Sequence, residues 1–76
     1  MSINTLDPVV LNDDLPFHGL RCGDMGAVVE IYSPEDFEVE FVTGAGRTQA
    51  LVPLHINQIR PVGPKDVPAV RSLDAA

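Results

Sequence analysis

The chain has 76 residues, enough for one small domain, and eleven Asp and Glu residues against five Lys and Arg residues give it a net charge of −6. This balance argues against nucleic-acid binding, because Lys and Arg side chains supply most of the affinity for phosphate backbones. The single cysteine excludes an internal disulfide framework. We expect a cytoplasmic globular domain with no targeting or membrane-spanning segment.

Short apolar segments separated by Pro and Gly predict strands rather than helices. The clearest pattern runs from Phe37 to Phe41, where apolar and acidic residues alternate strictly. Alternation places Phe37, Val39 and Phe41 in the core, with Glu38 and Glu40 in water. The predicted strands cover residues 8–11, 26–32, 37–41, 48–54 and 59–62.

The connections follow from the turn-forming residues. The Pro and Gly residues of 12–23 predict a long loop. In residues 33–36, Ser at the first position and Pro at the second predict a type I turn. Two glycines in 43–47 suit a hairpin turn. Residues 55–58 are predicted to form one 3₁₀ turn before the last strand. Pro53 cannot donate a ladder hydrogen bond, so it is predicted to lie at an edge of the sheet or at the end of its strand.

Together these elements predict an all-β domain, a small five-stranded SH3-like barrel over residues 1–62 with one 3₁₀ turn before the last strand. Its inward residues on the fourth strand are predicted to be Ala50, Val52 and Leu54. Residues 63–76 hold prolines, small residues and scattered charge, and we expect a disordered tail there.

The run from Leu15 to Tyr32 resembles the signature of a family of short bacterial proteins, domain-of-unknown-function family 4926. The likeness continues in residues 37–42, 46–48 and 50–52, and covers about residues 7–62. The resemblance implies an SH3-like barrel. It implies no catalytic or ligand-binding residue.

The stretch from Gly23 to Gly26 is a glycine-rich turn that more loosely resembles the start of KOW-type domains and of SH3-like modules in some enzyme subunits. A phosphate-binding loop would need a helix after the glycines, and a strand is predicted there instead. We therefore expect an entry turn in which Asp24 accepts hydrogen bonds from nearby amides.

Candidate residues for metal binding or nucleophilic catalysis are few. His18, Cys22 and Asp24 are ligand types, yet a structural zinc site normally takes four ligands, and His55 would have to reach across the fold. A Cys–His nucleophile needs a pocket that so small a barrel does not offer. We expect Cys22 to be a half-buried apolar side chain and His18 a loop residue, with no catalytic, metal or cofactor site.

The acidic residues of the second and third strands form the most informative pattern. Residues that pair across a hairpin share a face, so Glu30 is predicted to lie opposite Glu38 or Glu40. The turn acids Glu35 and Asp36 would extend this into one acidic patch. Two interpretations stay open. The patch is either a solvated face partly balanced by Arg47 or Arg60, or a docking surface for a basic partner.

Beside the acids, four apolar residues are predicted to point outward: Val28, Tyr32, Val42 and Leu51. Apolar side chains next to charges suit a protein interface, unless the tail or the long loop covers them. A groove for proline-rich peptides is excluded, because only Tyr32 and Phe17 remain as outward aromatic residues. The predicted partner-binding residues are Glu30, Tyr32, Glu38, Glu40 and Leu51.

These observations favour a non-enzymatic SH3-like module that binds a basic protein, either as an antitoxin-like or immunity-like protein or as an accessory protein. The alternatives are a KOW-like nucleic-acid or ribosome-associated module and an accessory subunit of a larger enzyme. Homodimerisation through the outward apolar residues is a further alternative, since it would enlarge a small core.

Overall fold

In a computed structural model, which describes residues 3–42 and 46–63, five antiparallel strands form one sheet in the order β4-β3-β2-β1-β5. Two one-turn 3₁₀ helices, η1 and η2, interrupt the connections. The elements are β1 (Pro8–Leu11), η1 (Pro16–His18), β2 (Met25–Ser33), β3 (Asp36–Val42), β4 (Thr48–His55), η2 (Ile56–Gln58) and β5 (Ile59–Pro61).

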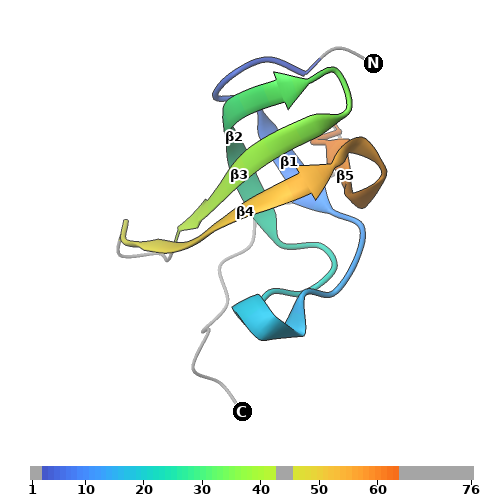
Figure 1. The fold of residues 1–76 in the computed structure, drawn as a ribbon. Coiled ribbons are helices and arrows are strands. Elements are labelled where there is room, and N and C mark those ends of the chain that lie inside the picture. Colours follow the sequence, from blue (N-terminus) through green and yellow to red (C-terminus); the bar gives the residue numbers. More distant parts are fainter. Residues whose placement is uncertain (1–2, 43–45, 64–76) are drawn as a thin grey trace.

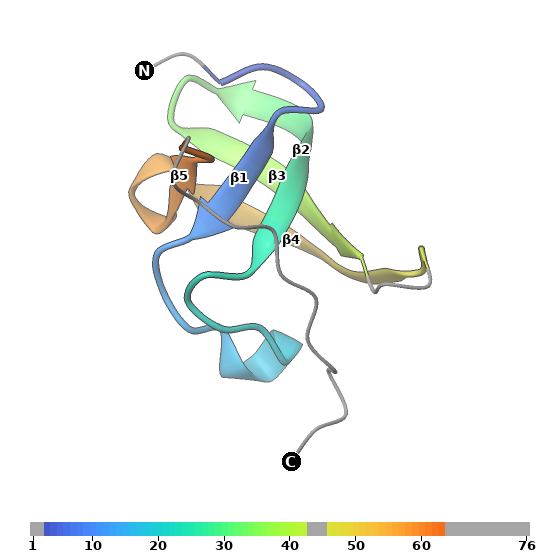
Figure 2. The same ribbon diagram turned by 180° about the vertical axis from the view of Figure 1, so that it is seen from behind.

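The sheet bends into two layers that share β2. The first residues of β2 pair with β1, and the greater part of β2 pairs with β3. Figure 1 shows β2, β3 and β4 in front with β1 and β5 behind them, and Figure 2 shows β1 in front of β3 and β4 from the opposite side. The prediction of an all-β, five-stranded SH3-like domain with a 3₁₀ turn before the last strand is confirmed. The barrel stays open between β4 and β5, which end the strand order.

The core lies between the two layers and contains the residues that the alternation predicts. Phe37, Val39 and Phe41 are at most 2% exposed, and β4 contributes the buried Val52 and Leu54. The other layer and the long loop complete the cluster. The remaining buried members are Val9, Leu11, Leu20, Val28 and Ile59, with Ala50 packed against them.

A β-bulge in β2 overturns one prediction, because Val28 is buried and not outward. Val28 pairs with Val39 and Glu30 pairs with Glu38, so the extra residue Val29 lies between them on β2. One extra residue reverses the inward and outward alternation beyond it. Val28 therefore faces the core at 0% exposure, while Glu30 faces outward.

Close packing of β2 on β3 depends on Gly26. A Cβ atom at this position would lie 2.7 Å from Cγ1 of Val39 and 2.8 Å from Cε1 of Phe41. Contacts that short do not occur between real side chains, so only glycine allows the strands to approach this closely. The second glycine of the motif therefore serves packing, while Gly23 takes the positive φ of +94° that the entry turn requires.

The predicted long loop between β1 and β2 contains η1 and is held by backbone pairing between Leu15 and Leu20. The Asp24 carboxylate accepts a hydrogen bond from the Arg21 amide at 2.9 Å, as the entry-turn interpretation requires. His18 is an exposed residue of this loop. Cys22 is exposed, so the prediction of a half-buried side chain is wrong. Its amide donates a hydrogen bond to the Asp14 carboxylate at 2.8 Å.

Both strands at the ends of the sheet carry a proline, Pro53 in β4 and Pro61 in β5. Of the two positions predicted for Pro53, an edge of the sheet or a strand end, the structure shows the edge, because β4 ends the strand order. Because proline has no backbone N–H, these residues weaken both edges as templates for another strand. The predicted tail beyond Gly63 lies outside the described residues, as do the turn residues 43–45.

Candidate functional site

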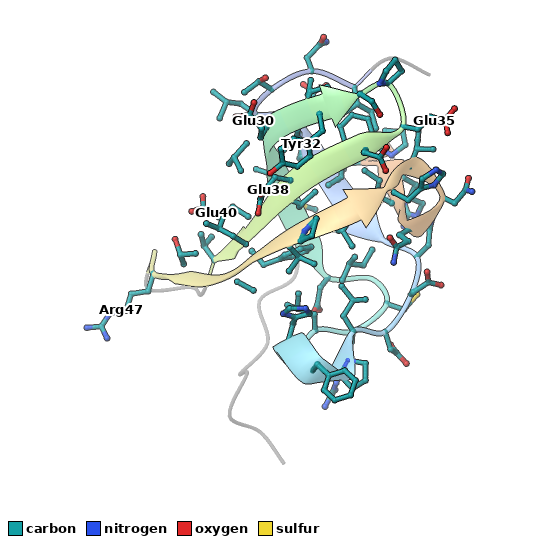
Figure 3. The ribbon with its side chains drawn as sticks, viewed as in Figure 1. Glu30, Tyr32, Glu35, Glu38, Glu40 and Arg47 are labelled. Carbon is teal, nitrogen blue, oxygen red and sulfur yellow. The ribbon has the colours of Figure 1, made fainter. Side chains whose placement is uncertain are left out.

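The outer surface of the β2-β3-β4 layer brings together all five residues predicted to bind a partner. Figure 3 shows Glu30, Tyr32, Glu38 and Glu40 along β2 and β3 on the same side of the sheet. Leu51 of β4 pairs with Glu40 of β3, which places it beside this row. We call this surface the acidic–apolar face and define it by Glu30, Tyr32, Glu38, Glu40, Val42 and Leu51.

Two carboxylates of this face are direct cross-strand neighbours. Glu30 pairs with Glu38, one of the two partners that the sequence predicted for it. Like charges opposite each other in a sheet destabilise it by about 0.2–1 kcal/mol. No hydrogen bond or ion pair involving the Glu30 carboxylate is found among the described residues. The pairing itself thus costs stability, and within the described residues only Glu38 of the two has a compensating contact, a hydrogen bond accepted from Tyr32.

Tyr32 joins the two carboxylates to the apolar part of the face. Its hydroxyl donates a hydrogen bond to the Glu38 carboxylate, while the side chain as a whole is 58% exposed. This hydrogen bond, and the negative charges of Glu38 and Glu30, raise the pKa of Tyr32 above its ordinary value of 10.0. The phenol is held neutral and fixed in place, with much of its ring in solvent.

The other end of the face combines Glu40 with two exposed aliphatic side chains. Glu40 accepts a hydrogen bond from the Thr48 hydroxyl at 2.7 Å. Val42 is 53% exposed and Leu51 is 54% exposed, in agreement with their predicted outward orientation. The alternation predicts that Glu38 and Glu40 lie in water. Both are only partly exposed, because neighbouring side chains cover part of each.

The carboxylates of Glu30, Glu38 and Glu40 have no cationic partner in the part of the chain that the structure describes. In Figure 3, Arg47 projects from the tip of the β3–β4 hairpin, away from the acidic row. Neutralisation by Arg47 or Arg60 was one interpretation of the acidic pattern, and no such ion pair forms within residues 3–42 and 46–63. Within the described residues, no ion pair therefore neutralises the face.

The acids at the β2–β3 turn have a different environment. Glu35 lies 3.3 Å from Nε2 of His55, and its carbonyl accepts a hydrogen bond from the Ile56 amide. Asp36 accepts a hydrogen bond from the Ser33 hydroxyl. The two contacts of Glu35 hold the hairpin turn against η2, and the contact of Asp36 lies within the turn. The predicted continuous acidic patch thus has a structural end and a row with no cationic partner among the described residues, and Figure 3 shows Glu35 at the end away from Glu40.

Within residues 3–42 and 46–63 there is no cluster of three or more His, Cys, Asp or Glu side chains able to hold a metal ion. A pocket of about 200 Å³ lies beside β1 and β5 and holds no His or Cys. Its lining is mostly aliphatic: Ile3, Asp7, Pro8, Val9, Pro61 and Val62. No helix in the described parts of the chain is both long and apolar enough to span a bilayer.

Comparison with protein families matches residues 5–61 to the domain of unknown function family DUF4926, and the chain belongs to this family. The match covers every strand of the sheet, including the whole acidic–apolar face. Neither the comparison with curated proteins nor that with solved structures gave a match.

Proposed function

We propose that the chain is a non-enzymatic interaction module that binds a basic protein through the acidic–apolar face. The observation that carries the proposal is a row of carboxylates that have no cationic partner among the described residues and lie beside half-exposed apolar side chains on one layer of the sheet. An isolated domain gains nothing in stability from facing like charges, whereas a basic partner would neutralise them.

The mixture of groups on the face also supports protein binding. Protein interfaces combine an apolar centre, often aromatic, with polar groups at the rim. Tyr32, Val42 and Leu51 supply apolar area, and the glutamates supply charge that would steer a basic partner toward it. The same charge would repel a phosphate backbone, so the proposal favours a protein over nucleic acid. The exposed thiol of Cys22 suits a reducing compartment, and the proposal places the module in the cytoplasm.

The test is capture of interacting proteins by the full chain and by charge-reversed variants at several salt concentrations. We expect basic proteins to be retained at low salt and released as ionic strength rises, because salt screens exposed charges. The variants Glu38→Lys and Glu40→Lys should lose this capture. The matched control is Asp13→Lys, which makes the same charge change in the β1–β2 loop and should retain it.

Capture that is the same for all of these variants would remove the acidic–apolar face from consideration. Nuclease treatment of the sample distinguishes the main alternative. A complex that disappears with the nuclease would indicate the KOW-like, nucleic-acid-associated module instead. A single larger acidic chain that survives high salt would indicate an accessory subunit.

A further inference from the structure

Tyr32 is an exposed aromatic residue beside two carboxylates of the acidic–apolar face. Its hydroxyl is tied to Glu38, and Glu30 lies directly across the strand pair from Glu38. Both carboxylates act on the phenol, as its raised pKa indicates. The ring therefore has one edge fixed by a hydrogen bond, while 58% of the side chain is open to solvent.

This combination distinguishes between the two basic side chains. A guanidinium is planar and weakly hydrated, so it can stack on an aromatic ring and also donate paired hydrogen bonds to a carboxylate. A lysine ammonium is a compact, strongly hydrated charge that loses more on desolvation and offers no planar donor pair. Glu30, which has no partner among the described residues, is available as the acceptor.

The edges of the sheet also limit how a partner can approach. A strand added beside β4 would meet Pro53, which offers no N–H for the new ladder, and a strand beside β5 would meet Pro61. We therefore expect a partner to contact the outer surface of the layer through its side chains. Recognition by side chains makes the choice between arginine and lysine decisive.

We propose that the acidic–apolar face selects arginine side chains of its partner, with a guanidinium stacked on Tyr32 and bonded to the carboxylates of Glu30 and Glu38. This inference rests on the proposed function, since it specifies the chemistry of the basic partner. It assigns Tyr32 the role of distinguishing arginine from lysine, and it assigns the glutamates the attraction for any cation.

The test uses two synthetic peptides of equal length in which either arginine or lysine alternates with glycine, titrated into the full chain by calorimetry at low salt. We expect the arginine peptide to bind about threefold to tenfold more tightly. The variant Tyr32→Leu keeps an apolar side chain but no ring, and should bring the ratio close to one. Tyr32→Phe keeps the ring and should preserve the preference.

Two further variants separate preference from attraction. Glu38→Gln should weaken the binding of both peptides. Asp13→Asn removes the same charge from the loop and should leave the ratio of the two peptide affinities unchanged. Equal affinity for the two peptides, or a ratio that survives in Tyr32→Leu, overturns the selection of arginine and leaves the basic-partner function standing. Binding of neither peptide to the full chain overturns both.

Discussion

The inner and outer surfaces of the β2-β3-β4 layer are formed by alternating residues of the same strands, yet they differ in packing and in charge. On the inner surface, Val39 and Phe41 pack beside Gly26 so closely that a single methyl group would not fit. On the outer surface, Glu30 faces Glu38, and Tyr32 is more than half exposed. The packed residues of the inner surface stabilise the fold, whereas the facing glutamates of the outer surface destabilise it.

This difference between the two surfaces indicates where a functional surface lies in a small domain. A domain of this size has only about 3–5 kcal/mol of stability to rely on, so an arrangement that costs stability is informative. Functional surfaces commonly carry such arrangements, since residues chosen for binding are not chosen for folding. The comparison between the two surfaces can be tested at three points.

The largest expected difference is between neighbouring residues of β3. Truncation of the buried Phe41 in Phe41→Ala should lower the free energy of unfolding by about 3–5 kcal/mol, because it leaves a cavity in the core. The next residue is half exposed, and Val42→Ala should change it by less than about 0.5 kcal/mol. Because the loss in Phe41→Ala equals the whole stability expected of the domain, circular dichroism should show this variant largely unfolded without denaturant, whereas urea denaturation measures the change in Val42→Ala. Similar losses in the two variants would contradict the division between the surfaces.

A smaller effect of opposite sign is expected on the outer surface. Glu30→Gln removes one of two facing charges and should raise the free energy of unfolding by a few tenths to about 1 kcal/mol, most at low salt. The same variant should weaken binding of a basic partner. Asp13→Asn, which removes a loop charge, is the control and should stabilise less. A loss of stability in Glu30→Gln would show that this carboxylate serves the fold.

The smallest effect concerns the proton of Tyr32. The hydrogen bond to Glu38 raises the pKa of this phenol in the folded chain. The stability that this hydrogen bond contributes is therefore complete below pH 10.0, and it is lost as the pH rises through the pKa of the phenol in the folded chain. Tyr32 is the only tyrosine and the chain has no tryptophan, so ultraviolet absorbance reports this group alone. Glu38→Gln should move the titration to lower pH. A folded chain that titrates like the urea-unfolded chain would argue against the hydrogen bond.

Much of the fold is predictable because local patterns carry it. The alternation from Phe37 to Phe41 identifies both surfaces of β3, and Pro53 marks an edge strand by its missing N–H. The opposition of Glu30 and Glu38 follows from hairpin pairing. The capping of η2 is less evident from the sequence, since His55 replaces the usual Ser, Thr, Asp or Asn at its N-cap.

Composition and period-two patterning are therefore sufficient for the all-β class, the order of the strands along the chain and most of the acidic–apolar face. Only the folded chain decides which β2 residues face inward, because one extra residue at Val29 reverses the alternation and no local pattern marks it. Contacts between segments distant in sequence likewise decide that Glu35 pairs with His55. Only the tertiary structure shows that, within the described residues, no Lys or Arg side chain forms an ion pair with the row from Glu30 to Glu40.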